Sequence, residues 1–208
     1  LGDVYKRQDL ATNPRRDREP GAVHLKIRFV TSNPNKVTEL SERLAPLGFE
    51  VEQVRHPYPE VQTDTLEEVA EHGLEYLAKE LGSGVVLEDA GLFIDALGGF
   101  PGVYSAYVLR TLGNPGILRL MDGKQDRSAR FEAVLGYLDE SGERHLFKGV
   151  CPGSIAAEAR GAGGFGFDPV FVPAGRDRTF AEMGVEEKGQ LSHRGRAAAA
   201  FAEFLGDI

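Results

Sequence analysis

The chain has 208 residues, of which 41% are hydrophobic and 27% are charged, as expected for a soluble globular protein with a substantial core. Its net charge of -8 argues against a general binder of nucleic acids or of anionic membranes. The single cysteine, Cys151, excludes an intramolecular disulfide framework and fits a reducing compartment. Because no apolar run has transmembrane length and no signal-peptide pattern is present, we expect a cytoplasmic protein.

Residues 1–24 differ in character from the rest of the chain. The sequence does not begin with Met, and residues 13–21 are charged and turn-rich with little apolar surface. We therefore expect a disordered or non-native extension over residues 1–24 and one folded domain over residues 25–208.

The domain is predicted to begin with a strand, Lys26 to Val30, which leads through a polar loop into a helix from Val37 to about Leu47. Within the loop, Asn33 or Ser32 can cap the helix, and Pro34 suits its first turn. The free N–H groups of that turn, together with Lys36, could then bind an anion. The plain alternative is a well-capped helix with a surface lysine.

The most informative stretch is 85–95, in which two apolar runs flank Glu88-Asp89-Ala90-Gly91. The first run predicts a buried strand that ends in a small-residue turn, so that both carboxylates lie where open α/β sheets bind their ligands. Small residues let a ligand approach the backbone, and paired carboxylates suit Mg²⁺. The alternative is a strand that ends in a solvated acidic turn.

The remaining pattern predicts an α/β fold with an antiparallel section. A strand at Phe49–Val54 and a helix that opens at Thr65, with Glu68 completing a capping box, precede the acidic strand. Two short helices are predicted around residues 103–112 and 115–121. The alternating stretch 129–138 is expected to pair with 144–151 as a β-hairpin.

A glycine-rich segment follows, and residues 161–166 match G-x-G-x-x-G. We reject a dinucleotide-binding fold, because Asp168-Pro169 and an extended run come next instead of a helix. The segment is better described as a loop that offers backbone amides, with Asp168 beside them. Phe165 or Phe167 could stack on a flat ring, or both could pack inward.

The last helix is expected to begin after Ser192, which places His193 and Arg194 in its first turn. Cations oppose the helix dipole there, so a ligand-binding role explains this placement better than a structural one. The sequence offers no set of residues for covalent catalysis.

Five motifs occur in one order along the chain: Thr31-Ser32-Asn33-Pro34-Asn35-Lys36, Glu88-Asp89-Ala90-Gly91-Leu92, the segment 98–105, the segment 164–171, and Ser192-His193-Arg194. Together they resemble the inosine triphosphate pyrophosphatase family, and in particular its archaeal members. The resemblance implies an elongated mixed β-sheet flanked by helices, two lobes around a central cleft, and a homodimer. It also implies hydrolysis of ITP, dITP or XTP to the monophosphate and pyrophosphate with Mg²⁺, or with Mn²⁺ in its place.

The resemblance further implies a role for each motif residue. Glu60 and Glu88 would hold the metal, and Asp89 would share it and act as the base that activates water. The substrate-binding residues would be Thr31, Ser32, Asn33, Pro34, Asn35, Lys36, Ala90, Phe165, Gly166, Phe167, Asp168, Lys188, His193 and Arg194. Two alternatives remain: the related septum-inhibitor-like branch, which cleaves pyrimidine or modified nucleotides, and a non-catalytic nucleotide-binding protein on the same fold.

Overall fold

A computed structural model describes residues 25–59 and 61–207 of the chain. The predicted extension over residues 1–24 and the predicted metal ligand Glu60 lie outside these residues. The strands are β1 (Leu25–Val30), β2 (Phe49–Val54), β3 (Val85–Ile94), β4 (Pro101–Gly102), β5 (Ser128–Leu138), β6 (Arg144–Ile155) and β7 (Phe171–Pro173). The α-helices are α1 (Pro34–Leu44), α2 (Leu66–Leu81), α3 (Ser105–Thr111), α4 (Gly113–Leu120), α5 (Val185–Leu191) and α6 (His193–Asp207).

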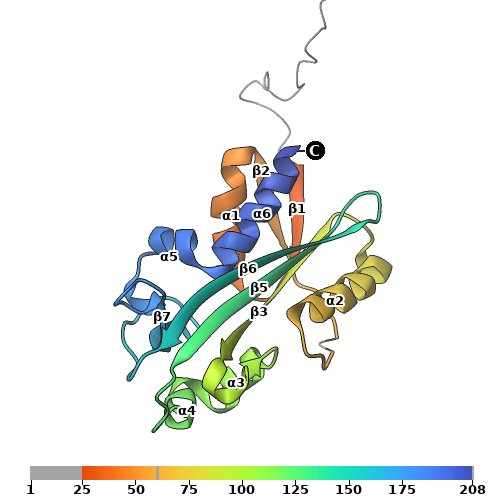
Figure 1. Ribbon diagram of the computed structural model, residues 1–208. Coiled ribbons are helices and arrows are strands. Elements are labelled where there is room, and N and C mark those ends of the chain that lie inside the picture. The colour runs from red at the N-terminus through yellow and green to blue at the C-terminus, as the bar shows by residue number, and fades with distance from the viewer. Residues whose placement is uncertain (1–24, 60, 208) are drawn as a thin grey trace, which may run out of the picture.

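One mixed sheet of seven strands organises the fold, in the order β2-β1-β3-β5-β6-β7 with β4 paired to β3. β1 is parallel to both β2 and β3, whereas the other pairs are antiparallel. The long β5–β6 hairpin, which pairs Leu138 with Arg144 next to its turn, confirms the predicted antiparallel section (Figure 1). The predicted α/β class with a mixed, elongated sheet is therefore confirmed.

The prediction of a turn after Asp89 is wrong, because β3 continues without a break for 10 residues. β5 pairs with β3 along this whole length, from Val85 opposite Leu138 to Ile94 opposite Ala129. Gly91 serves this strand rather than a turn: a Cβ added there would collide with the carbonyl oxygen of Gly102 in β4. The small residue is thus required by close packing between strands.

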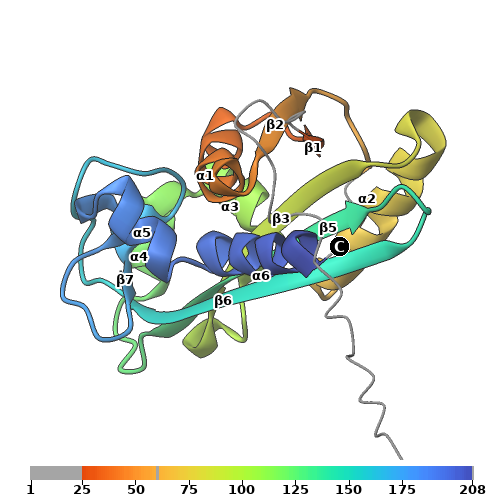
Figure 2. The ribbon, with the colours of Figure 1, turned by 90° about the horizontal axis from the view of Figure 1, so that it is seen from above.

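The helices cover the two faces of the sheet. α1 and α6 lie together on one face, and α2 lies on the other (Figures 1 and 2). Apolar side chains of α1 and α6 pack with Val86 and Leu135, whereas those of α2 pack with Leu87 and Val134. A third cluster gathers α3, α4 and the β7 end of the sheet around Phe171. This division leaves α1 and α6 facing each other across the middle of β3.

Local capping signals set the starts of the helices as predicted. The Asn33 side chain accepts a hydrogen bond from Asn35 N at 3.0 Å, and Ser192 Oγ accepts one from Gly195 N at 3.0 Å. Thr65 caps α2 through Glu68 N at 3.3 Å, but the predicted capping box is wrong, because the Glu68 carboxylate accepts from the Thr65 hydroxyl rather than from the Thr65 backbone N–H. Gly48, with φ 81°, ends the turn that follows α1.

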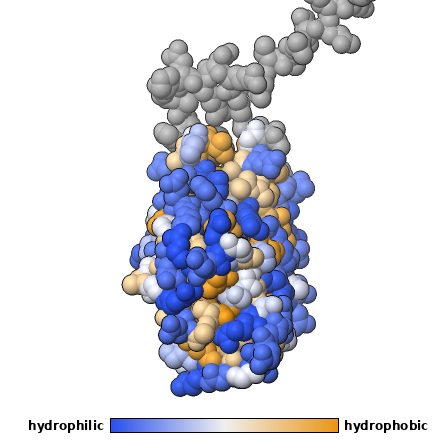
Figure 3. Space-filling view, turned by 60° about the vertical axis from the view of Figure 1, so that its left-hand side comes forward, coloured by the Kyte–Doolittle hydropathy of each residue, from blue (hydrophilic) through white to orange (hydrophobic). Residues whose placement is uncertain are grey.

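The surface beside α1 and α5 is mostly hydrophilic, with apolar residues in small groups along its middle (Figure 3). Among the described residues, no helix is both long and apolar enough to cross a membrane.

Candidate active site

The centre of the site is an open stretch of the β3 edge. On this edge β1 reaches only Val85 and Val86, and β4 reaches only Leu92 and Phe93. Within the described chain, residues 87–91 therefore have no strand partner on this side. β1 ends at this level and turns into α1, so that a mid-strand position on β3 lies at the carboxyl end of its neighbour. Glu88 and Asp89 thus reach the kind of ligand-binding position that the sequence predicted, by a different geometry.

The two predicted carboxylates point to opposite faces of the sheet, because side chains alternate along a strand. Ala90, two residues after Glu88, packs against the cluster that contains α1 and α6. Leu87, two residues before Asp89, packs against the cluster that contains α2. Neighbours in sequence thus serve different sides of β3.

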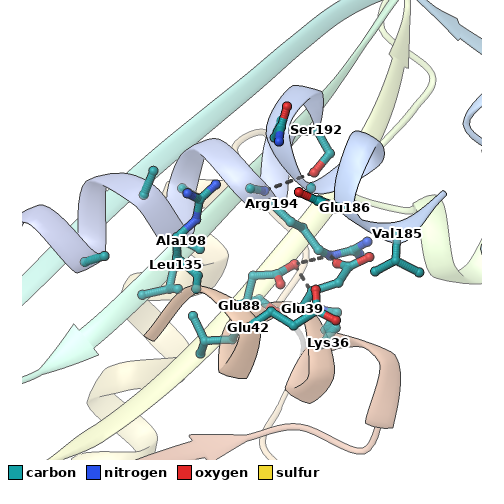
Figure 4. Close-up of a pocket in the computed structure, with 18 of the residues that line it drawn as sticks. Lys36, Glu39, Glu42, Glu88, Leu135, Val185, Glu186, Ser192, Arg194 and Ala198 are labelled. Atoms are coloured by element: carbon teal, nitrogen blue, oxygen red, sulfur yellow. Dashed lines mark hydrogen bonds and ion pairs between the residues drawn. The ribbon is translucent and has the colours of Figure 1, made fainter. Parts of the chain in front are cut away.

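Glu88 is only 8% exposed and carries two cations (Figure 4). Arg194 Nε donates to Glu88 Oε1 at 2.9 Å, and Lys36 Nζ lies 3.4 Å from the same oxygen. Lys36 Nζ also donates to the Glu88 carbonyl oxygen at 2.8 Å, at the unpaired strand edge. Burial alone would raise the pKa of the Glu88 carboxyl, but the charges of Arg194 and Lys36 outweigh burial and hold that pKa below its usual value. Glu88 is therefore anionic at neutral pH.

Asp89 is half-buried on the α2 side of β3, and its Oδ1 accepts a hydrogen bond from Ala90 N at 2.9 Å. Tyr58, two residues before the predicted ligand Glu60, packs against the α2 cluster on the same side. A carboxylate beside an unpaired strand edge supplies the oxygen ligands that a hard cation prefers, so Asp89 fits a divalent metal.

The loop before α1 forms a polar cradle. Thr31 Oγ1 accepts from Asn33 N at 3.1 Å, so hydroxyl and amide groups fold back on the chain at the start of the helix. Ser32, Pro34 and Asn35 are exposed, whereas Lys36 turns inward to Glu88. The free N–H groups of the first turn of α1 suit an anionic group such as phosphate.

Phe165 lies between two cations at the other end of the site. Its ring centroid is 4.5 Å from Lys188 Nζ and 4.8 Å from Arg194 Cζ. Asp168 Oδ2 holds this arrangement together by accepting from Phe165 N and from Lys188 Nζ, each at 2.7 Å. Gly166 contributes a carbonyl oxygen that accepts from Asn114 at 3.1 Å.

Phe167 takes a different place from Phe165, although sequence analysis proposed both for substrate binding. Its side chain is 3% exposed and belongs to the apolar cluster around Phe171. Phe165 is the ring that remains beside the charged residues.

His193 is 1% exposed and stacks on Phe131, with ring centroids 4.6 Å apart and an interplanar angle of 9°. Within the described part of the chain, neither ring nitrogen has a hydrogen-bond partner. Burial, together with the charges of Arg194, Lys188 and Lys36, places the pKa of His193 well below its usual value. His193 thus holds a neutral imidazole, with one donor and one acceptor, next to the cations of the site.

Glu39 is a site residue that sequence analysis missed. It lies one turn after Lys36 on α1, with one carboxylate oxygen 3.4 Å from Lys188 Nζ and the other 3.9 Å from Arg194 Nε. It lines both a cavity of about 490 Å³ between α1 and α6 and a smaller one of about 180 Å³ beside Phe165. Its spacing of three residues from Lys36 was the available signal, since that spacing places both on one helix face.

The fold and the site together define an α/β protein with a charged cleft, suited to a polyanion at one end and a flat polar ring at the other. A family model described as the Ham1 family matches residues 27–204, and the chain belongs to this family.

The chain is similar to proteins of archaea and bacteria over nearly its whole folded length. It is 55% identical to a dITP/XTP pyrophosphatase of Thermococcus kodakarensis over 181 residues, which are 87% of this chain and 97% of the relative. It is 52% identical to a dITP/XTP pyrophosphatase of Methanopyrus kandleri, with 86% of this chain and 96% of the relative covered. A solved HAM1 protein of Coxiella burnetii superposes with a TM-score of 0.78 at 30% identity, covering 88% of this chain and 100% of that one.

Proposed function

We propose that this protein hydrolyses dITP, XTP and ITP to the nucleoside monophosphate and pyrophosphate. Its archaeal relatives named dITP/XTP pyrophosphatase support this activity. The observation that carries the choice of substrate is His193, whose buried ring nitrogens have no partner within the described residues and lie close enough to Arg194 and Lys188 for their charges to lower its pKa. A buried polar group without a partner is costly, and a ligand that satisfies it removes this cost.

The base pocket would favour a 6-oxo purine. Phe165 would stack on the base, and His193, Arg194, Lys188 and Asp168 would surround its edge. An oxygen at position 6 accepts hydrogen bonds from donors such as Arg194 and Lys188, whereas the amino group of adenine is itself a donor. Adenine would therefore leave a buried donor unpaired, which lowers its transition-state binding.

The triphosphate would occupy the cradle at the start of α1, with Thr31, Ser32, Asn33, Pro34 and Asn35 around it and Lys36 as its cation. Asp89, together with Glu60, would hold Mg²⁺ or Mn²⁺, and Ala90 would contact the substrate through its backbone. A bound metal would withdraw charge from the phosphates and lower the pKa of its water. Asp89 would take a proton from the water that attacks the α-phosphorus, while the fixed cations position the phosphates.

Isotope labelling tests this chemistry directly. In H₂¹⁸O with Mg²⁺, dITP and XTP should give pyrophosphate and a monophosphate that carries the label, because water attacks the α-phosphorus. Asp89→Asn should lower kcat by about 100-fold or more. The control Asp122→Asn, at an exposed position just after the end of α4, should leave kcat unchanged. Release of single phosphates, or full activity of Asp89→Asn, would contradict the proposal.

The quaternary structure is a separate part of the proposal. We expect a homodimer, because the family resemblance implies one. Light scattering coupled to size-exclusion chromatography should give twice the chain mass, and a monomer at micromolar concentration would contradict this expectation.

A further inference from the structure

A continuous chain of alternating charges joins the two ends of the site. It runs from Lys36 to Glu88 (3.4 Å), to Arg194 (2.9 Å), to Glu39 (3.9 Å), to Lys188 (3.4 Å) and to Asp168 (2.7 Å). The first residue belongs to the phosphate cradle on α1, whereas Arg194, Lys188 and Asp168 contact Phe165. The chain crosses from α1 through β3 and α6, and then passes through α1 again to α5, so it ties together elements that are distant in sequence.

Glu88 is the link that connects the phosphate end to this chain. Its side chain is 6% exposed, and one oxygen receives both Lys36 and Arg194. Lys36 is fixed twice, because it also donates to the Glu88 carbonyl oxygen. In Figure 4 the three side chains converge between α1 and α6, on the face of β3 opposite to Asp89.

A metal ion at the Glu88 carboxylate would compete with the two cations that already bind there. Because Lys36 and Arg194 approach the same carboxylate oxygen, a metal on that oxygen would separate a largely buried ion pair, which is unfavourable. Asp89 faces the other side of the sheet, where Tyr58 packs, so a metal bound at Asp89 does not need Glu88 as a ligand.

We propose that Glu88 is a positioning residue that fixes Lys36 and Arg194 relative to each other, and that it does not bind the metal. This inference rests on the proposed function, since Lys36 is taken to bind the triphosphate and Arg194 the base. Through Glu88, a correctly seated base and a correctly seated triphosphate support each other. Loss of its charge therefore loosens both ends of the substrate while the metal site stays intact.

The test is Glu88→Gln, which keeps the shape of the side chain and removes its charge. The matched control is Glu42→Gln. Glu42 lies on α1 one turn after Glu39, lines the same cavity between α1 and α6 as Glu88, and is exposed. Mn²⁺ binding to the nucleotide-free protein, followed by electron paramagnetic resonance, should stay within about twofold of wild type in both variants. Asp89→Asn should weaken it by about tenfold or more, as loss of a metal ligand does.

Kinetics then separate positioning from metal binding. In Glu88→Gln, KM for dITP should rise by about tenfold or more, and added Mg²⁺ should not restore it. In an Arg194→Gln background, the further change Glu88→Gln should raise KM by less than it does in wild type, because the part of its effect that acts through Arg194 is already lost. Thermal unfolding of each variant checks that the fold is intact, and Glu88→Asp, which keeps the charge, should partly restore KM.

Three results would overturn the inference: Mn²⁺ binding to Glu88→Gln that is weakened as much as in Asp89→Asn, activity that recovers at high Mg²⁺, or effects of Glu88 and Arg194 that simply multiply. The Mn²⁺ measurement needs no substrate. A wild-type protein that binds Mn²⁺ without hydrolysing dITP would therefore contradict the proposed function. The Mn²⁺ measurement on Glu88→Gln would still decide whether Glu88 binds the metal.

Discussion

At the residue scale, His193 combines packing in the core with the base recognition that we propose. Its ring stacks on Phe131 as a core side chain would, yet both of its nitrogens lack partners among the described residues. The sequence placed this residue in the first turn of the last helix and expected a cation there, but the low pKa makes it a neutral group. Burial by residues distant in sequence causes that difference, and the motif itself does not reveal it.

We expect His193→Phe to keep the stacking on Phe131 and to lose substrate recognition. The kcat/KM for dITP should fall by about tenfold or more, and the preference for dITP over dATP should shrink, because the pocket loses a polar partner for the base. Steady-state kinetics with both nucleotides check this result. His72→Phe, at an exposed position on α2, is the control and should leave both values unchanged.

The variant His193→Phe should also change how the free energy of unfolding depends on pH. The pKa of His193 is lower in the folded state than the usual value of 6.5, so the unfolded chain binds a proton more readily below that pH. The stability that depends on neutral His193 is fully present above pH 6.5. It is lost as the pH falls, by about 1.4 kcal/mol per pH unit for one proton. Urea unfolding at pH 7.5 and pH 5 should show a smaller loss in His193→Phe than in wild type, and equal losses would contradict the assignment.

At the element scale, the sequence predicted helix ends, which depend on local contacts, but not the full course of β3, which depends on a distant strand. Asn33, Thr65, Ser192 and Gly48 specify helix ends through contacts within a few residues, so the sequence predicted them. The continuous course of β3 depends on β5, which follows about forty residues later, and the role of Gly91 depends on Gly102. A strand that passes beyond one neighbour and meets another cannot be distinguished from a turn by local composition.

The close packing of α6 on β6 gives a prediction at this scale. A Cβ at Gly149 would collide with the carbonyl oxygen of His193 and would lie 2.6 Å from Ala197 N. We expect Gly149→Ala to destabilise the fold by about 1–3 kcal/mol and to raise KM, since it pushes the start of α6 away from the site. Urea unfolding and kinetics measure both effects. Gly206→Ala, in the same helix with open space around it, should be neutral or slightly stabilising.

At the scale of the whole molecule, the site exists only where α1, β3, α5 and α6 meet. Most of the residues that meet there come from the predicted motifs, because each motif carries local chemistry that the family resemblance could match. The resemblance could not show that Glu88 and Asp89 serve opposite faces of the sheet, that Phe167 belongs to the core, or that Glu39 joins Lys188 to Arg194. These features depend on the strand register and on the way the helices pack over it.

The measurement that tests the central claim most directly is pyrophosphate release from dITP, XTP, dATP and dTTP at equal concentration with Mg²⁺. We predict that dITP and XTP are turned over with kcat/KM about 100-fold or more above dATP and dTTP, because a buried donor left unpaired by the wrong base costs this much. Preferred turnover of dTTP would keep the metal site and contradict the purine pocket. Tight binding of dITP without any pyrophosphate release would contradict the enzyme itself.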